Sequence, residues 1–252
     1  MSELFVYYDD ATGERTGLTA AELGGWAAAT GALLTEGCGL GPGSRVAVLL
    51  PPHWQTAAVL LGAWSAGLEV SYRGWATAGL SPAGAGFDAT FVERRRVGNW
   101  LDDVPSGRHP FVLGLAPAGA PAPDVPAGYR DFATEVRSYL GAAPPAQLAG
   151  AGDLAAVGAT FGEYGELAAG IAESYGIGPG DRVLLDAAGS EQPLMWLLAP
   201  LAAGPPSCSA PTSTRPASTS GSRPRASRTC WARRCRDRHI RANRERSRSE
   251  VY

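Results

Sequence analysis

Two glycine-rich segments are the first places in the sequence where chemistry could occur. Residues 39–43 read Gly-Leu-Gly-Pro-Gly, and residues 176–180 read Gly-Ile-Gly-Pro-Gly. A phosphate-binding loop needs its glycines after a strand and before a helix, so that backbone amides converge on the anion. Here a helical pattern precedes each segment and an apolar strand pattern follows it, which favours structural turns. Arg45 and Arg182 open the two strands, and for them pairing with local carboxylates or capping of the preceding helix is favoured over anion binding.

His53 and Trp54 are the residues that we single out as candidates for a ligand contact. They follow the first predicted strand, near the carboxyl edge at which open α/β sheets bind ligands. The interpretation that we favour is, however, a histidine in a surface loop. His109 precedes another predicted strand without an evident partner, and no Ser-His-Asp arrangement emerges from the sequence.

Other groups of reactive side chains do not define a site. The three arginines at 94–96 could meet phosphate, but a solvated turn before a helix is favoured. Cys230, Cys235 and His239 lack the nearby fourth ligand of a structural zinc site. The sequence contains no lysine, which excludes a Schiff base, a phosphate-loop lysine and a lysine general base. We therefore predict no catalytic residue and no metal site.

The elements that would position these residues form an internal repeat. Each copy has a helix opening at a threonine (Thr19 or Thr160), a glycine turn, a strand opening at an arginine, and a second helix. Gly67 and Gly204 end the copies, each 22 residues after its arginine. A repeat of this length indicates how the fold is organised, whereas a single motif does not.

Hydrophobic periodicity predicts the individual elements. Strands are predicted at 5–8, 45–50, 68–72, 89–93 and 111–115, and helices at 19–34, 54–66, 97–102 and 129–140. Alternating strands and helices predict an α/β fold with mainly parallel strands, in two related subdomains that contain β-α-β units. We place the first subdomain at residues 1–140, a partial second one at 141–204, and a basic, low-complexity tail, predicted to be disordered, at 205–252.

Charge divides the chain at the same boundary. The net charge of −2 combines about +9 from the twelve arginines and three acids after residue 204 with about −11 from the rest. Nucleic-acid binding through the arginine-rich tail is one interpretation, but we do not favour it. A single cysteine before the tail, Cys38, indicates a reducing compartment. With no signal peptide and no apolar stretch of membrane-spanning length, we predict a cytoplasmic protein without a membrane partner.

The change of composition after Gly204 suggests a shift of the reading frame. When residues 205–231 are given GC-rich codons and read from the third base of each codon, one permitted translation is AVVLGAHLDPARLDERVAAEGVTHLL. That segment has the pattern of a strand, a turn, an amphipathic helix and a further strand, so it continues the repeat. Our hypothesis is a frameshift near codon 204, and resequencing would reveal the inserted or missing base.

The repeat resembles the N-terminal part of the adenylate-forming superfamily, which includes acyl-CoA synthetases, adenylation domains of nonribosomal peptide synthetases, and luciferases. The matching segments are residues 18–23 (Leu-Thr-Ala-Ala-Glu-Leu), 39–52, 66–70 (Ala-Gly-Leu-Glu-Val), 175–185 and 198–204. That superfamily holds the ATP phosphates in a Ser/Thr/Gly-rich loop ending in Pro-Lys-Gly. Here residues 152–157 match the strand before that loop, and residues 158–162 pass directly into the next helix. The family's later nucleotide motifs and its C-terminal domain with a catalytic lysine have no counterpart either.

The resemblance implies shared fold ancestry and transfers no catalytic residue. The favoured function is a truncated, catalytically inactive relative of acyl-CoA synthetases that uses no cofactor, with ATP or AMP as ligands only if residual binding persists. Its partners are unknown, and a nucleotide or an acyl ligand is the possibility that the family implies. The alternative is part of an active acyl-adenylating enzyme that another polypeptide completes.

Overall fold

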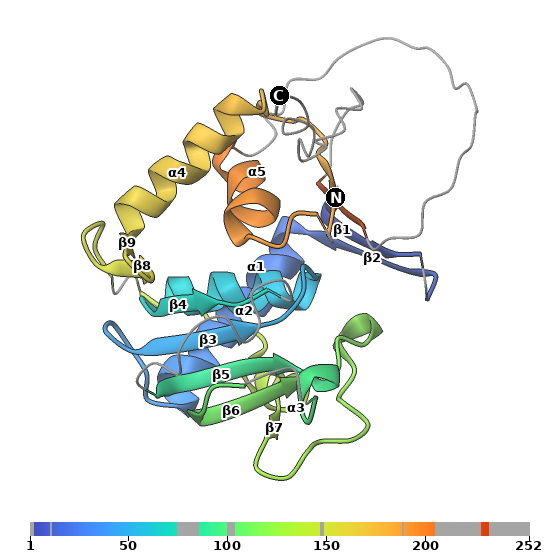
Figure 1. The fold of residues 1–252 in the computed structure, drawn as a ribbon, viewed down its shortest axis with the longest axis vertical. Helices are drawn as coiled ribbons and strands as arrows, with labels where there is room; N and C mark the ends of the chain where they lie inside the picture. Colours follow the sequence, from blue (N-terminus) through green and yellow to red (C-terminus); the bar gives the residue numbers. More distant parts are fainter. Residues whose placement is uncertain are drawn as a thin grey trace, which may run out of the picture.

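The computed structural model describes residues 3–10, 12–74, 86–99, 104–146, 149–187 and 189–204, and the backbone of residues 228–231. Two sheets and the helices around them make up this part of the chain (Figure 1). The sequence-based prediction of an α/β fold is confirmed, and the larger sheet is mainly parallel as expected.

The larger sheet has seven strands in the order β7-β6-β5-β3-β4-β8-β9. Every neighbouring pair is parallel except β8 and β9, which form an antiparallel hairpin. The strands are β3 (Arg45–Leu49), β4 (Glu69–Tyr72), β5 (Phe87–Glu93), β6 (Gly107–Leu113), β7 (Arg130–Asp131), β8 (Leu154–Ala156) and β9 (Ala159–Thr160). β3 lies at the centre, and its residues Val46 to Leu49 are fully buried, which explains its continuous apolar sequence.

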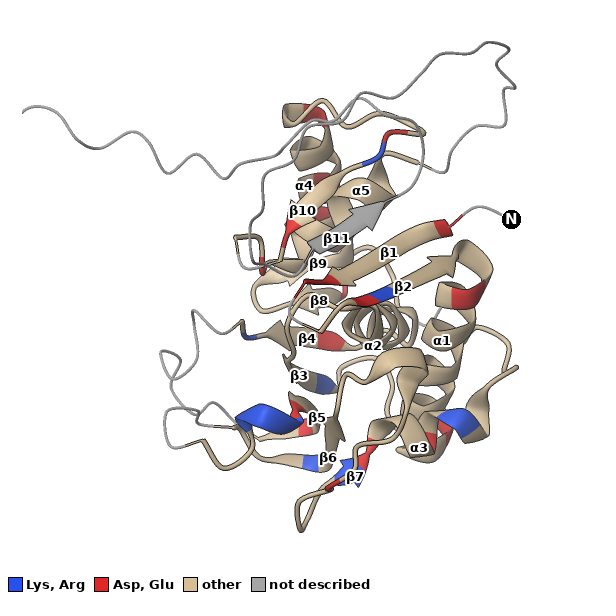
Figure 2. Cartoon of the chain, turned by 90° about the vertical axis from the view of Figure 1, so that its right-hand side faces the viewer, with Lys and Arg blue, Asp and Glu red and all other residues tan. Residues whose placement is uncertain are grey.

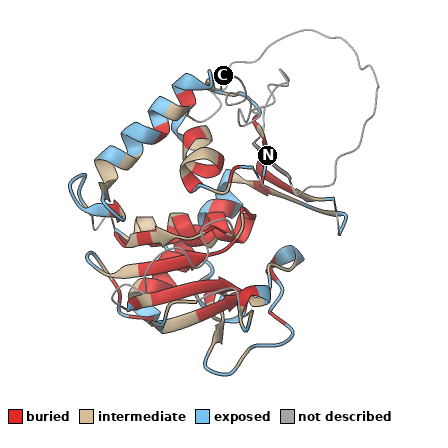
Figure 3. Ribbon diagram, in the orientation of Figure 1, coloured by how far each residue is buried: buried red, intermediate tan, exposed pale blue. Residues whose placement is uncertain are grey.

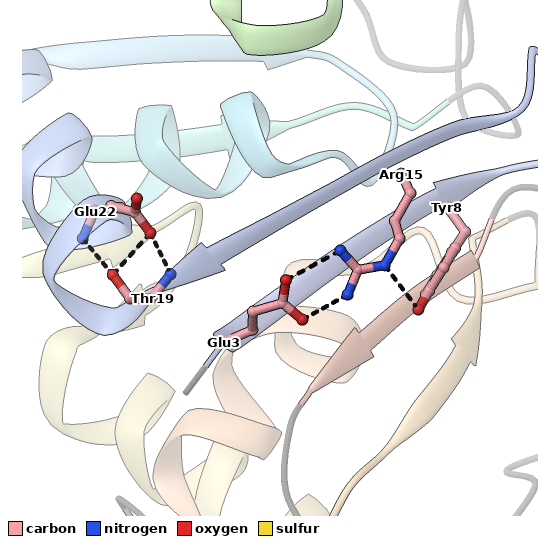
Figure 4. A network of polar contacts seen from close by, with 5 residues as sticks. All are labelled: Glu3, Tyr8, Arg15, Thr19 and Glu22. Carbon is pink, nitrogen blue, oxygen red and sulfur yellow. Dashed lines mark hydrogen bonds and ion pairs between the residues drawn. The ribbon is translucent and has the colours of Figure 1, made fainter. Parts of the chain in front are cut away.

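The smaller sheet is antiparallel and has the order β10-β11-β1-β2. Its strands are β1 (Glu3–Asp9), β2 (Glu14–Thr19), β10 (Leu184–Asp186) and β11 (Arg228–Trp231). The hairpin of β1 and β2 is fastened on one side by Arg15, which binds both carboxylate oxygens of Glu3 and the hydroxyl of Tyr8 (Figure 4). β2 was not predicted, because its sequence, Glu-Arg-Thr-Gly-Leu-Thr, has little apolar alternation.

The main helices are α1 (Ala20–Ala32), α2 (Trp54–Ser65), α3 (Phe132–Val136), α4 (Phe161–Ser174) and α5 (Ala199–Ala202). α1 continues into a π-helical turn (Leu33–Gly37), and a second π-helical turn (Leu194–Leu198) leads into α5. Single 3₁₀ turns occur at Arg94–Arg96, Pro117–Gly119 and Arg137–Tyr139. None of the described helices has both the length and the apolar character needed to cross a membrane.

The main core lies between β3, β4, β5, β6 and the helices α1 and α2 (Figure 3). α1 and α2 approach closely because Gly62 faces α1 without a side chain, and a Cβ there would lie 2.5 Å from the Thr30 Cβ. Trp54 and Trp196 are fully buried, while Trp26 and Trp64 pack against the core from its edge. Tryptophans therefore make up a large part of this core and its edge.

Two parts of the chain, which we call unit 1 and unit 2, share several local features. Unit 1 runs from β1 to β4, and unit 2 runs from β8 to Gly204. Each unit begins with a hairpin that leads into a helix closed by a capping box, formed by Thr19 and Glu22 in unit 1 (Figure 4) and by Thr160 and Glu163 in unit 2. In each box the threonine hydroxyl accepts the N3 amide and the glutamate accepts the N-cap amide, so two otherwise unpaired amides are satisfied.

The hairpin of each unit lies in the sheet that contains a later strand of the other unit. The hairpin of unit 2, β8 and β9, extends the larger sheet of unit 1, while the hairpin of unit 1, β1 and β2, lies in the smaller sheet with β10 of unit 2. The sheets therefore do not coincide with the sequence repeats. As a result, the start of α4 contacts β8 and β9 of the larger sheet, and the start of α1 contacts β1 and β2 of the smaller sheet.

Several predicted elements differ from the structure. The strand predicted at 111–115 is β6, which begins four residues earlier, and the helix predicted at 129–140 is reduced to α3 and one 3₁₀ turn. Of the helix predicted at 97–102, residues 97–99 are not helical, and the rest lies outside the described residues. The tail was predicted to be disordered, yet residues 228–231 form β11. Residues 205–227 and 232–252 lie outside the described part.

Candidate functional site

The first place to test for nucleotide binding is the connection from β8 to α4, where the related superfamily has its phosphate loop. β8 and β9 are joined by only two residues, Val157 and Gly158, and Gly158 takes a positive φ of 76° that suits a tight turn. Val157 is 66% exposed at the tip. The structure therefore has a short hairpin at the position where the resemblance implies a long loop.

The N-terminus of α4 is also closed by the chain itself. The Phe161 amide donates to the Asp153 carbonyl and the Gly162 amide donates to the Ala151 carbonyl, both at 2.8 Å. The Glu163 amide donates to the Thr160 hydroxyl at 3.3 Å. A helix N-terminus binds an anion through such amides when they are free, and here the first three are occupied.

The two Gly-Pro-Gly segments are turns between a helix and a strand, as the sequence predicted. In unit 1 the Ser44 amide donates to the Gly41 carbonyl at 2.9 Å, and the Ser44 hydroxyl accepts the Gly41 amide at 3.3 Å. In unit 2 Asp181 makes the same pair of contacts with Gly178, at 3.1 Å and 2.9 Å. These internal bonds hold the turn and use the amides that a phosphate would need.

Arg45 pairs locally, in agreement with the sequence analysis. Its Nε lies 3.6 Å from a carboxylate oxygen of Glu69, and its guanidinium lies over the Phe87 ring at 5.2 Å. The Arg45 amide donates to Asp88 at 2.9 Å. Figure 2 marks the basic and acidic residues along the ribbon of both sheets. Arg182, at the matching position of unit 2, is exposed.

His53 is the N-cap residue of α2 and is 1% exposed, so it is not a residue of a surface loop. Its Nδ1 accepts the Gln55 amide at 3.2 Å, and its ring packs edge-on against Tyr7 with 4.5 Å between centroids. Burial lowers the pKa of His53 to about 3, which keeps the imidazole neutral. Because Nδ1 is an acceptor, the proton of the neutral ring is on Nε2.

Trp54 lies beside His53 and is equally buried, with its indole edge-on to Trp26 at 5.3 Å. Within the described part of the chain, neither the Nε2 of His53 nor the Nε1 of Trp54 has a hydrogen-bond partner. Two buried N–H groups therefore lie unpaired at the start of α2. A ligand would have to reach the core to meet them, so the assignment of these residues as ligand contacts stays a prediction.

The carboxyl edge of the larger sheet holds further buried polar groups that the sequence did not reveal. The Tyr72 hydroxyl donates to the Leu50 carbonyl at 2.7 Å, and Arg96, 1% exposed, donates to the Arg73 carbonyl at 3.1 Å. Glu93 is also buried and pairs with Arg95. The burial of Arg96 shows that the prediction of a solvated turn at residues 94–96 is wrong for this residue. Its burial comes from the short 3₁₀ turn that follows β5.

His109 also differs from its description in the sequence, where it had no evident partner. It lies within β6, and its Nδ1 is 3.2 Å from Nη1 of Arg130, which also contacts Cys38. Burial and the nearby Arg130 lower the pKa of His109. Arg130 in turn pairs with Glu135, so the cluster is a partly buried ion-pair network.

A cavity of about 440 Å³ lies between the C-terminal end of α2 and the N-terminal end of α4. Its lining is mostly apolar and consists of Trp64, Ser65, Pro145, Ala149, Gly150, Ala151, Phe161 and Gly162. The Trp64 indole is held by a hydrogen bond of 3.0 Å to the Ala155 carbonyl. This cavity and the His53–Trp54 pair lie at opposite ends of α2. The described residues contain no group of three metal-binding side chains.

The fold and the motifs define an α/β protein similar to the N-terminal part of adenylate-forming CoA ligases. No family model matches the chain. A TIGR03089 family protein of Mycobacterium tuberculosis (strain H37Rv) is 39% identical over 200 residues, which cover 79% of this chain and 78% of that protein. The chain therefore belongs to the TIGR03089 family. About a fifth of each protein lies outside the matched region.

Among solved structures, the chain is similar to the anthranilate CoA ligase AuaEII in complex with anthranoyl-AMP (16% identity, TM-score 0.40, covering 56% of this chain). It is also similar to an acyl-CoA synthetase of Brucella canis (20%, TM-score 0.42, 60%) and to VinN in complex with 3-methylaspartate (21%, TM-score 0.47, 70%). The matched region spans 27%, 28% and 48% of those three chains.

Proposed function

We propose that this chain does not adenylate carboxylates and that it acts as a binding or scaffold protein built on an adenylate-forming-ligase-like fold. The observation that supports this proposal is the two-residue connection between β8 and β9. A phosphate loop at this position would have to present several free amides and a cationic side chain to the triphosphate. The hairpin presents neither, since the first three amides of α4 are bound and residues 157–163 include no lysine or arginine.

Charge and shape support an acyl or aryl ligand over a nucleotide. The cavity at the junction of α2 and α4 has the size of a small ligand site and is lined by Trp64, Phe161 and Pro145. Described residues on its wall carry no charge that would balance a phosphate. We infer that any residual ligand binding at this place uses an apolar group, with ATP and AMP excluded by the missing cation.

A carboxylate-dependent ATP–pyrophosphate exchange assay on the purified full chain tests the proposal. We expect exchange at the level of a buffer control for a panel of aliphatic and aromatic acids. Turnover that persists through a second purification step, and that disappears with the variant Gly162→Trp, would overturn the proposal. That variant fills the cavity beside α4. A matched substitution at an exposed helix position, Gly165→Ala, serves as the control for folding.

The alternative is an acyl-adenylating enzyme that another polypeptide completes. One observation favours it: the outer side of α4 is exposed, although the same side of α1 is buried in unit 1 (Figure 3). Exchange activity that appears only after a cell extract is added, and that co-elutes with this chain as a complex, would support this alternative.

A further inference from the structure

The cavity between α2 and α4 lies at the junction of the two units. Trp64, near the C-terminal end of α2, belongs to unit 1, whereas Phe161 and Gly162 begin α4 in unit 2. Trp64 also contacts unit 2 directly: its indole donates to the Ala155 carbonyl of β8 at 3.0 Å, and its ring centroid lies 5.7 Å from that of Tyr164 in α4. A molecule bound in this cavity would therefore contact both units.

Small residues leave this space open, and each of the two helices contributes one aromatic ring to its wall. Five of the eight wall residues have a small side chain or none: Ser65, Ala149, Gly150, Ala151 and Gly162. The volume of about 440 Å³ lies in the lower part of the range of about 300–1,000 Å³ that is typical of ligand pockets. Since a cavity of about 150 Å³ holds a benzene molecule, this one has room for two fused rings.

The chain itself uses most of the hydrogen-bond donors on the wall. The amides of Phe161 and Gly162 donate to backbone carbonyls, and the Gly150 amide donates to the Asp153 carboxylate at 2.7 Å. The indole N–H of Trp64 is bound as well. A carboxylate that leaves water for this cavity would need several donors or a cation in exchange. These four N–H groups are not free to serve it.

The charge of the surrounding segment also disfavours an anion. Residues 138–181 include five acidic residues and neither arginine nor lysine. One of the five, Asp153, contacts the wall directly through the Gly150 amide. A carboxylate or a phosphate in the cavity would therefore be repelled by this segment. A neutral ligand avoids that cost.

One side chain of the wall can still accept a hydrogen bond. The Ser65 hydroxyl donates to the Gly62 carbonyl at 2.8 Å, so its oxygen keeps lone pairs for the donor of a ligand. Trp64 and Phe161 offer aromatic surface against which a planar ring can pack. The wall thus suits a flat molecule with one hydroxyl or N–H group.

We propose that this cavity binds a neutral aromatic molecule with one hydrogen-bond donor, such as a phenol or an indole, with its ring against Trp64 and its donor on Ser65. This ligand class rests on the binding role proposed for the chain, and it differs from the carboxylic acids on which adenylate-forming enzymes act. Because the cavity is formed by both units, the bound ligand should also stabilise the folded chain.

Titrations of the ¹⁵N-labelled full chain with 2-naphthol and with 2-naphthoate test the proposal, because the two probes share a ring system and differ in charge. The reporter is the indole N–H resonance of Trp64. We expect saturable shifts with 2-naphthol and at least about tenfold weaker binding of 2-naphthoate, whose carboxylate would lose water without gaining partners. Ser65→Ala should weaken the binding of 2-naphthol by about two- to tenfold, which corresponds to one hydrogen bond.

Two tryptophan variants provide a matched pair. Ala151→Trp fills the cavity from an exposed position and should abolish the shifts, whereas Ala169→Trp, at an exposed position of α4 outside the wall, should leave them unchanged. Equal affinity for the two probes, no saturable shift with 2-naphthol, or undiminished binding by the Ala151→Trp protein would overturn the proposal. These results are independent of the proposed absence of adenylation, which the pyrophosphate exchange assay measures separately.

Discussion

Glu163 accepts hydrogen bonds from both the backbone amide and the hydroxyl of Thr160, each at 2.9 Å, and Thr160 accepts the Glu163 amide in return. This closed pair stands at the N-terminus of α4, immediately after the β8–β9 hairpin, where the resemblance implies a phosphate loop. The same pair, Thr19 and Glu22, begins α1. The N-terminus of α4 is thus capped by the chain itself. The amides of the first three residues of α4 are bound and are not free to bind a nucleotide.

The two capping boxes should contribute alike to stability. Thr160→Ala removes the acceptor of the Glu163 amide, and we expect a loss of about 1 kcal/mol in the free energy of unfolding, as for other threonine caps. Thr19→Ala should cost a similar amount in unit 1, and Thr160→Ser should restore most of it. Urea denaturation measures all three. A Thr160→Ala protein as stable as the parent would show that the cap of α4 is not formed.

His53 should make stability fall with acid. Burial holds its folded pKa at about 3, below the unfolded value of about 6.5, so between these pH values the unfolded chain binds a proton that the native chain does not. The free energy of unfolding therefore decreases as the pH is lowered from about 6.5 towards 3, by at most about 1.4 kcal/mol per pH unit from this group.

The substitution His53→Asn keeps an N-cap acceptor and removes the titrating ring. We expect it to flatten the acid limb of the stability curve, whereas His109→Asn should change that limb less because His109 is less buried. Chemical denaturation at a series of pH values is the measurement. An unchanged slope in the His53→Asn protein would contradict the burial of a neutral imidazole.

Two glycines in α1 and α2 should respond in opposite ways to alanine. A Cβ at Gly62 would lie 2.5 Å from the Thr30 Cβ and 2.7 Å from the Ala27 carbonyl oxygen, so Gly62→Ala should destabilise the chain by about 1–3 kcal/mol. Gly24 has no atom within 4 Å of such a Cβ, and Gly24→Ala should stabilise α1 by about 0.5–1 kcal/mol. Thermal unfolding of both proteins decides the matter, and destabilisation of equal size would refute the close approach of the helices.

The different burial of two leucines predicts unequal costs of their replacement by alanine. Leu33 is fully buried, and Leu33→Ala should cost about 2–5 kcal/mol. Leu167 is half exposed, so Leu167→Ala should cost less than about 1 kcal/mol in the chain as printed. Urea titrations of the two variants and the parent protein measure these costs. Equal costs at Leu33 and Leu167 would contradict the exposed position of Leu167 on α4.

Much of the fold could be predicted from the sequence because it is encoded locally. The strand β3 is a continuous apolar run, and the capping box at Thr19 and Glu22 marks the start of α1. β2 was not predicted, because cross-strand contacts such as that of Arg15 with Glu3 hold it in place. The hydrophobic periodicity of a single strand does not reveal such contacts. The exchange of hairpins between sheets is likewise a tertiary feature with no local signal.

The candidate site was predicted less well, because burial and partners depend on residues far apart in the sequence. The pairing of His109 with Arg130 arises from the parallel strands β6 and β7, 21 residues apart. Arg96 is buried and donates to the carbonyl of Arg73, a residue 23 positions away that the arginine run itself does not reveal. For His53, the sequence revealed only that the residue follows a predicted strand. The core around it includes residues of β1 and α1, which are far away in the sequence.

The central claim, that α4 does not bind nucleotide phosphates, is tested most directly by a titration of the ¹⁵N-labelled full chain with ATP and Mg²⁺. The amides of Phe161, Gly162 and Glu163 are the reporters, because they would be the donors of any phosphate cradle at this helix. We predict that their chemical shifts stay unchanged up to millimolar ATP. Saturable shifts of these three amides, absent with AMP, would contradict the account.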